Sequence, residues 1–358
     1  MTKRWVIIIL VLLMVVSQGC KRSLSEATII WKYETGTVLS SIISYNGKLF
    51  IGSQNSYIYC LDEDTGNLVF RYKTQGTVWS LSEIYDEKLY VGSGNYIYCI
   101  DVVGENLVFQ YETKGDVYSA PQIYNRAVYV GSTDGYLYCL DKNTGTLIWK
   151  YQSNGSSLPQ GRGIYTSPAV YNGKVYIGAD NRYVYCLDCE TGKLLWRYET
   201  SGEIRSPLEI DSGRLYDSGR LYVGSLDGSL YCLNGNTGEL VWKYNAEGSI
   251  QSTPVIYNDR LYVGADDCCI YCLNGNTGEL IWKYETGGQI QHSLIINNGK
   301  LYTGSTDYYL YCLNGNTGEL IWKYKTDNWI AYSLKIRNQR IYIGSSGDYF
   351  YCLLINVR

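Results

Sequence analysis

Cysteine is the residue type whose number and spacing in this chain most invite chemistry. The 358 residues include 12 cysteines but a single histidine, His292. Cys268 and Cys269 are adjacent, Cys272 follows, and Asp266 precedes them, which makes this segment the densest group of soft-metal ligands. The C-C-x-x-C spacing lacks the paired C-x-x-C units of a zinc site. We therefore interpret Cys268 and Cys269 as turn residues, with a soft-metal site as the alternative, and predict no metal centre.

Eight other cysteines mark one position of an internal repeat. The repeat runs through a strand, Gly-Ser, an Asp-Gly-like turn, Tyr-x-Tyr-Cys-Leu, a Thr-Gly turn and Leu-Ile-Trp-Lys-Tyr. A period of about 40 residues indicates a solenoid, a propeller or an array. If the repeats are the blades of a propeller, equivalent cysteines of adjacent blades lie on the order of 11 Å apart, which is too far for a disulfide, so we predict free thiols. The eight are Cys60, Cys99, Cys139, Cys186, Cys232, Cys272, Cys312 and Cys352.

Each repeat contains four short strand patterns. In the sixth repeat they cover Ile250–Ile256, Leu261–Gly264, Ile270–Leu273 and Leu280–Tyr284, with alternating apolar residues and turn-forming Asn, Asp and Gly between them. Four antiparallel strands every 40 residues are typical of a propeller blade. The last repeat lacks its fourth strand, and Ile29–Tyr33 supplies one without a blade in front of it. We predict an all-β, eight-bladed β-propeller, closed by Ile29–Tyr33 completing the last blade.

The innermost strands place one residue per blade near a central channel. These residues form a candidate binding ring at the channel mouth, with three aromatic residues on consecutive blades and one charge. Glu83, Asp116 and Glu209 are the nearest acids, and each is isolated in sequence, so no catalytic group is predicted. A water-filled channel lining is the plainer alternative. The candidate ring residues are Trp79, Tyr118, Tyr165, Arg205, Gln251 and Gln291, with Leu39 and Ala331 at the two remaining positions.

Three segments depart from the repeat. A long connection after Trp149 contains Arg162, which we consider a candidate flap over the channel mouth or else a neutral surface insertion. A tandem copy, 211–216 followed by 217–222, extends a hairpin on the opposite face and is expected to carry no function. The second blade has Gly104-Glu105 in place of Thr-Gly, and Phe109 in place of Trp, so a looser blade is expected there.

The N-terminus has the pattern of an export signal. Lys3 and Arg4 precede an apolar run from Trp5 to Val16, which is too short to span a bilayer and suits a signal peptide. Gly19 before Cys20 is typical of a lipoprotein signal, with Cys20 as the lipidated residue; an ordinary cleaved signal or an uncleaved anchor is the alternative. We therefore divide the chain into a signal (1–20), a short tether (21–28) and one propeller (29–358).

Composition excludes two further classes of protein. With 46% apolar and 18% charged residues, the chain is not disordered. Its net charge of -3 and lack of a basic block argue against nucleic-acid binding.

The segment "CLNGNTGELIWKY", which begins at Cys232, Cys272 and Cys312, resembles the repeat of the pyrroloquinoline-quinone (PQQ) enzymes and their non-enzymatic relatives. The resemblance implies that the fourth-strand tryptophans dock onto the neighbouring blade and lock the ring. PQQ alcohol dehydrogenases also carry an adjacent Cys-Cys disulfide beside the quinone, but Cys268-Cys269 falls at a turn position. The tryptophans in question are Trp31, Trp149, Trp196, Trp242, Trp282 and Trp322.

The blades are near-minimal, whereas the quinoprotein dehydrogenases have extra length that holds the cofactor. The chain is therefore closer to the non-enzymatic, BamB-like lipoprotein branch, which acts in outer-membrane β-barrel assembly. This resemblance implies a monomeric, lipid-anchored scaffold that binds protein partners at the cell envelope, with no enzyme activity and no cofactor. Two alternatives remain: a cell-surface propeller that binds a ligand or carbohydrate, and a PQQ-dependent dehydrogenase.

Overall fold

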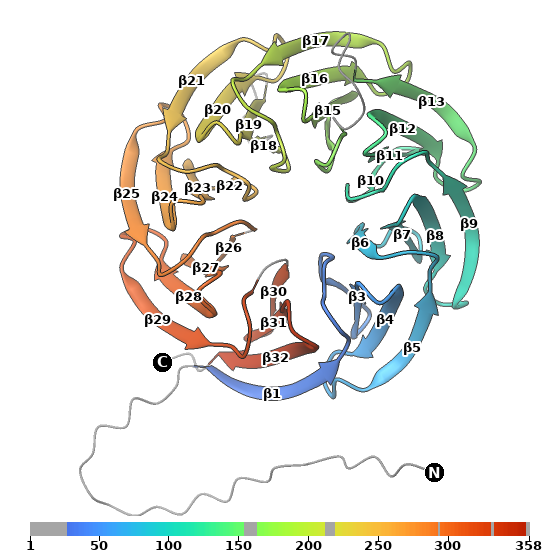
Figure 1. The fold of residues 1–358 in the computed structure, drawn as a ribbon, viewed down its shortest axis with the longest axis horizontal. Coiled ribbons are helices and arrows are strands. Elements are labelled where there is room, and N and C mark those ends of the chain that lie inside the picture. Colours follow the sequence, from blue (N-terminus) through green and yellow to red (C-terminus); the bar gives the residue numbers. More distant parts are fainter. Residues whose placement is uncertain (1–26, 154–162, 212–218, 293, 331–332, 356–358) are drawn as a thin grey trace, which may run out of the picture.

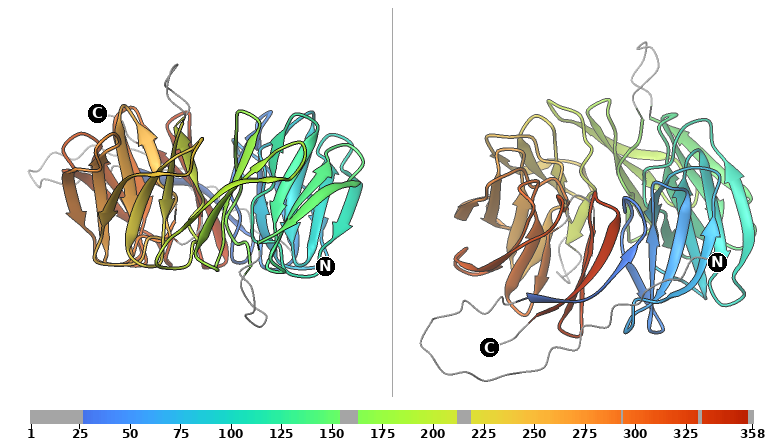
Figure 2. Two further views of the ribbon diagram at one scale, coloured as in Figure 1. Left: turned by 90° about the horizontal axis from the view of Figure 1, so that it is seen from above. Right: turned by 60° about the horizontal axis from the view of Figure 1, so that its bottom comes forward.

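The computed structural model describes residues 27–153, 163–211, 219–292, 294–330 and 333–355. They form eight four-stranded antiparallel sheets around a central channel, so the predicted eight-bladed propeller is confirmed (Figure 1). Figure 2 shows the ring edge-on, with the blades standing side by side. No helix in this part of the chain is long and apolar enough to cross a membrane. We number the blades in chain order, from blade 1 (β2–β5) to blade 8 (β30–β32 with β1).

The strands of each blade run outward from the channel in chain order. The innermost strands are β2 (Ile43–Tyr45), β6 (Val78–Leu81), β10 (Gln122–Tyr124), β14 (Ala169–Tyr171), β18 (Glu209–Asp211), β22 (Val255–Tyr257), β26 (Ile295–Asn297) and β30 (Ser333–Arg337). The second strands are β3 (Lys48–Gly52), β7 (Lys88–Ser93), β11 (Ala127–Gly131), β15 (Lys174–Gly178), β19 (Arg220–Gly224), β23 (Arg260–Gly264), β27 (Lys300–Gly304) and β31 (Arg340–Gly344). The third strands are β4 (Tyr57–Asp62), β8 (Tyr96–Asp101), β12 (Tyr136–Asp141), β16 (Tyr183–Asp188), β20 (Ser229–Asn234), β24 (Cys269–Asn274), β28 (Tyr309–Asn314) and β32 (Tyr349–Ile355). The outermost strands are β5 (Leu68–Lys73), β9 (Asn106–Glu112), β13 (Leu147–Gln152), β17 (Leu194–Glu199), β21 (Leu240–Asn245), β25 (Leu280–Glu285), β29 (Leu320–Lys325) and β1 (Ala27–Glu34).

The innermost strands are shorter than the sequence pattern predicts. In blade 6 the expected strand 250–256 is reduced to β22, Val255–Tyr257. Above it, the Ser252 hydroxyl replaces ladder hydrogen bonds: it accepts from the Gly264 N–H and donates to the Gly264 carbonyl, both at 2.8 Å. Pro254 has no N–H to offer a ladder. The segment above the strand therefore lines the upper channel without being part of a continuous sheet.

The first strand of the chain closes the ring. β1 pairs antiparallel with β32, from Ala27 opposite Ile355 to Glu34 opposite Tyr349. The closing strand thus begins at Ala27, two residues before the predicted Ile29. It includes the last two residues of the predicted tether as well as the whole of the expected segment Ile29–Tyr33. Closure leaves blade 8 with the same four strands as the others, and it removes a free sheet edge at the join.

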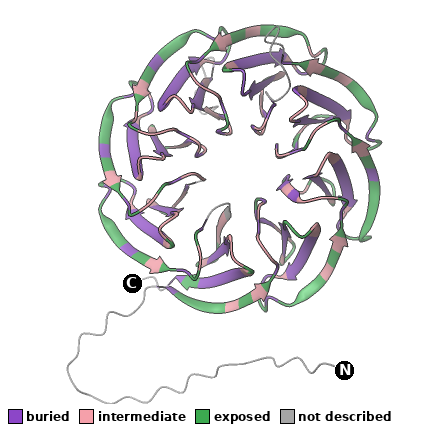
Figure 3. Cartoon of the chain, in the orientation of Figure 1, coloured by how far each residue is buried: buried purple, intermediate pink, exposed green. Residues whose placement is uncertain are grey.

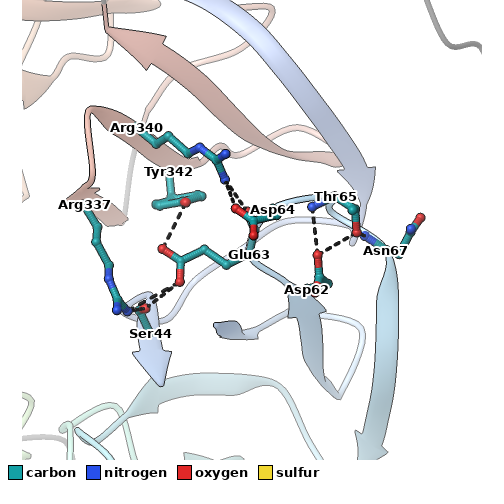
Figure 4. A network of polar contacts seen from close by, with 9 residues as sticks. All are labelled: Ser44, Asp62, Glu63, Asp64, Thr65, Asn67, Arg337, Arg340 and Tyr342. Atoms are coloured by element: carbon teal, nitrogen blue, oxygen red, sulfur yellow. Dashed lines mark hydrogen bonds and ion pairs between the residues drawn. The ribbon is translucent and has the colours of Figure 1, made fainter. Parts of the chain in front are cut away.

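Polar contacts reinforce the seam between blade 8 and blade 1 (Figure 4). The buried Glu63 carboxylate accepts a hydrogen bond from the Tyr342 hydroxyl at 3.2 Å and lies 3.4 Å from the Arg337 guanidinium. The Arg340 guanidinium contacts Asp64 Oδ1 at 2.7 Å and the Glu63 carbonyl at 3.1 Å. Two arginines of the last blade therefore hold the third-to-fourth turn of the first blade.

The hydrophobic core lies between the blades rather than inside one of them. Figure 3 shows buried second and third strands and exposed outer strands in every blade. In one cluster Tyr262, Ile270 and Trp282 of blade 6 pack with Ile290 of blade 7. A Cβ on Gly264 would lie 2.1 Å from the Ile290 Cγ2, so glycine is needed where the next blade inserts its first apolar residue.

The fourth-strand tryptophans contact the neighbouring blade as the family resemblance implies. In four of them the indole N–H donates to a backbone carbonyl of the next third-to-fourth turn, at 3.0–3.2 Å. The donors are Trp149, Trp196, Trp242 and Trp282, and the acceptors are Cys189, Gly235, Gly275 and Gly315 respectively.

The remaining docking aromatics vary this contact. Trp31 packs on Gly66, but its buried indole N–H has no hydrogen-bond partner in the described structure. Trp322 is buried in the cluster between blades 7 and 8. At the contact between blades 1 and 2, Glu105, at φ 55°, occupies the turn position where blades 1 and 3 to 7 have a glycine. The docking aromatic there is Phe70, which is smaller than tryptophan. Blade 2 nevertheless has all four strands, with its Phe109 buried.

Candidate functional site

The mouth of the channel lies on the face that carries the turns between second and third strands and the connections from fourth to first strands. We call this the top face. Of the predicted ring, Trp79, Tyr118 and Tyr165 come together as one continuous row, which we call the aromatic arc. The ring centroids of Trp79 and Tyr118 lie 4.3 Å apart, and those of Tyr118 and Tyr165 lie 5.2 Å apart. All three side chains are partly exposed.

Hydroxyl side chains fix the backbone beneath the aromatic arc. Ser80, which follows Trp79, donates from Oγ to the Ser119 carbonyl of blade 3 at 2.7 Å. Thr166, which follows Tyr165, donates from Oγ1 to the Gly178 carbonyl at 2.8 Å. The first of these buried bonds joins blade 2 to blade 3, and the second joins the inner segment of blade 4 to its own second strand. The backbone that carries the partly exposed rings is therefore held in place.

Arg205, the one charged residue of the predicted ring, extends the arc and is paired with carboxylates. Its guanidinium lies 5.2 Å from the Tyr165 ring centroid. It makes two hydrogen bonds to the Asp180 carboxylate, at 3.2 and 3.1 Å, and an ion pair with Glu203 at 3.0 Å. The Asp180 side chain is only 2% exposed, and its bonds raise the pKa of Arg205. The two carboxylates therefore hold Arg205 in place and neutralise it.

Gln251 and Gln291 meet on a second carboxylate. Gln251 donates from Nε2 to Asp266 Oδ2 at 2.8 Å, and Gln291 donates from Nε2 to Asp266 Oδ1 at 3.0 Å. Asp180 and Asp266 occupy the same repeat position, two residues after the glycine that ends the second strand. The other repeats have uncharged residues there, namely Gln54, Gly94, Thr133, Leu226, Thr306 and Ser346. This difference between the repeats could have identified Asp180 and Asp266 from the sequence.

The remaining residues near the mouth form no comparable group among the described residues. Trp329 of blade 8, which is not a member of the predicted ring, is 37% exposed in a top-face connection. Leu39 is half-buried. Cys20, Arg162 and Ala331 lie outside the described residues, as does most of the tandem copy.

Two of the three inner-strand acids have charged neighbours. Glu83 of blade 2 pairs with Lys335 of blade 8 at 3.5 Å. Burial, together with the charge of Asp211, raises the pKa of Glu209 to about 7. Burial lowers the pKa of His292 to about 4, so this histidine is neutral at physiological pH.

The cysteines are mostly structural. None of the eleven described cysteines forms a disulfide, and all but Cys268 are buried. Cys268 has φ 67° and occupies the turn position that is Gly135 in blade 3 and Gly228 in blade 5. This supports the interpretation of Cys268 and Cys269 as turn residues. Within the described residues there is no group of three or more His, Cys, Asp or Glu side chains suited to a metal ion.

The mouth does not suit the quinone cofactor that the fold suggests. PQQ is an acidic quinone, whose carboxylates require cationic partners. The described mouth instead holds Arg205 already paired with Asp180 and Glu203, and places a further carboxylate, Asp266, between two glutamines. We derive no catalytic step through that cofactor.

The repeat region matches one protein family along most of its length. The family model is described as outer membrane protein assembly factor BamB and matches residues 84–171, 159–217, 209–299 and 269–353. The chain belongs to the BamB family. A comparison with curated protein sequences gives no match.

Solved structures share the fold at low sequence identity. BamB from Moraxella catarrhalis is 17% identical with a TM-score of 0.76, covering 92% of this chain and 99% of that one. The quinohemoprotein alcohol dehydrogenase ADHIIG from Pseudomonas putida HK5 is 13% identical with a TM-score of 0.78, covering 93% of this chain and 76% of that one. A europium-containing methanol dehydrogenase is 12% identical with a TM-score of 0.79, covering 95% of each chain. The fold is thus shared by BamB and by PQQ-type dehydrogenases, and function has to be argued from the site.

Proposed function

We propose that this propeller is a non-catalytic scaffold of the cell envelope, which binds a protein partner through the mouth on its top face. The observation that carries the proposal is the aromatic arc. Trp79, Tyr118 and Tyr165 form a rigid, partly exposed surface, and large aromatic side chains dominate the binding energy of protein interfaces. Membership of the BamB family supports the same role.

In-cell crosslinking followed by affinity capture tests this function. We expect the wild-type chain to recover β-barrel assembly proteins or nascent barrel proteins. Alanine at Trp79, Tyr118 or Tyr165 should reduce that recovery without changing the thermal unfolding temperature. The matched control is Tyr257→Ala, because Tyr257 is a 41% exposed aromatic at the other end of an inner strand. Equal recovery by all four variants would rule out the aromatic arc as the contact surface.

We also propose that Cys20 is lipidated and that the propeller is thereby tethered to a membrane. The sequence around Cys20 supports this proposal. Cys20→Ser should move the protein from the membrane fraction to the soluble fraction, and metabolic labelling with a fatty-acid analogue should be lost. An unchanged distribution would favour an uncleaved anchor.

A ligand-binding propeller is the second candidate. The aromatic arc faces the same channel as the Gln251–Asp266–Gln291 group, and apolar rings beside a few convergent polar groups are typical of small-molecule sites. Titration with soluble oligosaccharides, monitored by the fluorescence change that Trp79→Phe removes, tests this function. No saturable change would eliminate it.

We propose no enzyme activity, since Arg205, which lies at the mouth, is already paired with Asp180 and Glu203 and is not free to bind an acidic quinone. Added PQQ and calcium should give no dye-linked oxidation of alcohols. Saturable, PQQ-dependent turnover would overturn this part of the proposal.

A further inference from the structure

Cys189 is a cysteine at a repeat position where the other repeats have none. It lies three residues after Cys186, in the third-to-fourth turn of blade 4. Its side chain is buried, with 3% exposure. The corresponding residues of the other third-to-fourth turns are Glu63, Val102, Lys142, Gly235, Gly275 and Gly315.

The fold places Cys189 against a cysteine of the preceding blade. The Cys189 carbonyl accepts hydrogen bonds from the Tyr129 hydroxyl at 3.1 Å and from the Trp149 indole at 3.0 Å, both in blade 3. Tyr129 pairs directly with Cys139 on the adjacent strand. Tyr129, Cys139 and Cys189 are buried in the same cluster of side chains. Tyr129 therefore lies where a cysteine of blade 3 and a cysteine of blade 4 come together.

These two thiols border a cavity at the seam between blades 3 and 4. The cavity has a volume of about 660 Å³, and Cys139, Cys189 and Tyr129 line it together with Arg126 and Glu190. Arg126 and Glu190 are exposed, so the cavity connects with the surface. A small ion can therefore reach the thiols without unfolding the seam.

We propose that Cys139 and Cys189 form a binding site for a soft monovalent cation, Cu(I) or Ag(I), held between the two sulfurs. Soft thiolate ligands select Cu(I), whereas a structural zinc site needs four ligands. No third His, Cys, Asp or Glu completes a larger metal group among the described residues.

The charge balance favours a monovalent ion. Binding replaces two S–H bonds by two sulfur–metal bonds and releases two protons, with no change of oxidation state. The resulting bis-thiolate complex carries one negative charge. Arg126 offsets part of this charge, since its guanidinium acts electrostatically on Cys139, whereas the carboxylates of Asp188 and Glu190 act on Cys189 in the opposite sense.

The test is a titration of the reduced full-length chain with Cu(I), in competition with a chromophoric Cu(I) chelator. We expect one ion bound per chain at this site, and its loss in both Cys139→Ala and Cys189→Gly. Neither substitution should disturb the fold, because glycine occupies the Cys189 position in blades 5, 6 and 7 and alanine is a small residue at a buried strand position. The matched control is Cys232→Ala, the same strand position in blade 5, where the next turn offers Gly275 instead of a cysteine.

Proton release provides an independent readout. Burial raises the pKa of the Cys139 thiol to about 12 and that of the Cys189 thiol to about 11, so both are protonated at pH 7. Each bound ion should therefore release two protons, and affinity should rise with pH. Binding that persists in both variants, or that only Cys268→Ser abolishes, would overturn the proposal. Loss of both thiols by disulfide formation on Cu exposure, with no ion retained, would overturn it as well.

Discussion

Replacing Trp282 by alanine should destabilise the propeller by about 4 kcal/mol. Trp282 is 9% exposed and packs between blades 6 and 7, on Gly318. Truncating a buried tryptophan costs about 3–5 kcal/mol, which includes the cavity left behind. The indole N–H bond to the Gly315 carbonyl, at 3.1 Å, contributes about 1 kcal/mol of this. The acceptor remains satisfied in the variant, because the Tyr262 hydroxyl also donates to it at 3.0 Å.

Equilibrium unfolding in urea measures this free energy. The midpoint should fall while the slope stays unchanged, since the substitution alters stability and not the surface exposed on unfolding. Trp282→Phe is the graded control: it keeps a ring on Gly318, as Phe109 does on Gly145, and should cost about 1–2 kcal/mol. A loss below about 1 kcal/mol for Trp282→Ala would refute the claim that inter-blade docking stabilises the ring.

A double-mutant cycle tests the same contact from the opposite side. A Cβ on Gly318 would lie 2.7 Å from the Trp282 Cδ2, so Gly318→Glu should be strongly destabilising in the wild type. It should cost at least about 1 kcal/mol less in the Trp282→Phe background, because Phe70 and Glu105 show that this smaller pair is compatible with the fold. Additive effects would mean that the two positions are not coupled.

The remaining predictions concern pH and blade packing. The pKa of His292 is about 4 in the folded protein and about 6.5 in the unfolded chain, so the unfolded chain protonates this histidine first as the pH falls. Stability is therefore lost as the pH falls from about 6.5 towards 4. Glu209 acts in the opposite sense: its folded pKa of about 7 means that stability is lost as the pH rises from about 4.5 to 7. Urea midpoints of His292→Ser should therefore fall with rising pH in that range, and those of Glu209→Gln should rise; parallel curves for both variants and the wild type would refute the assignment. Gly264→Ala should lower the free energy of unfolding by about 1–3 kcal/mol because its Cβ overlaps Ile290, and Ile290→Ala should relieve this added cost; a neutral Gly264→Ala would show that the seam can adjust.

The sequence predicted the number and type of the blades because those signals are local. Alternating apolar residues, turn residues and the recurring Cys and Trp lie within one repeat of about 40 residues, and each repeat folds in the same way. The displaced fourth strand at the N-terminus then required closure, which the pairing of β1 with β32 confirms. The length of the inner strands was wrong, because the Ser252 side chain, rather than a backbone partner, satisfies Gly264.

The chemistry of the mouth was decided by tertiary structure. The candidate ring could be selected from the sequence because its members share one repeat position. The pairing of Arg205 with Asp180 joins the segment before a first strand to a turn of the previous blade, 25 residues earlier. The convergence of Tyr129 and Cys189 joins residues 60 apart in different blades. A repeat determines what each blade is, but only the packing of one blade against the next determines which side chains meet, since those contacts cross the boundary between repeats.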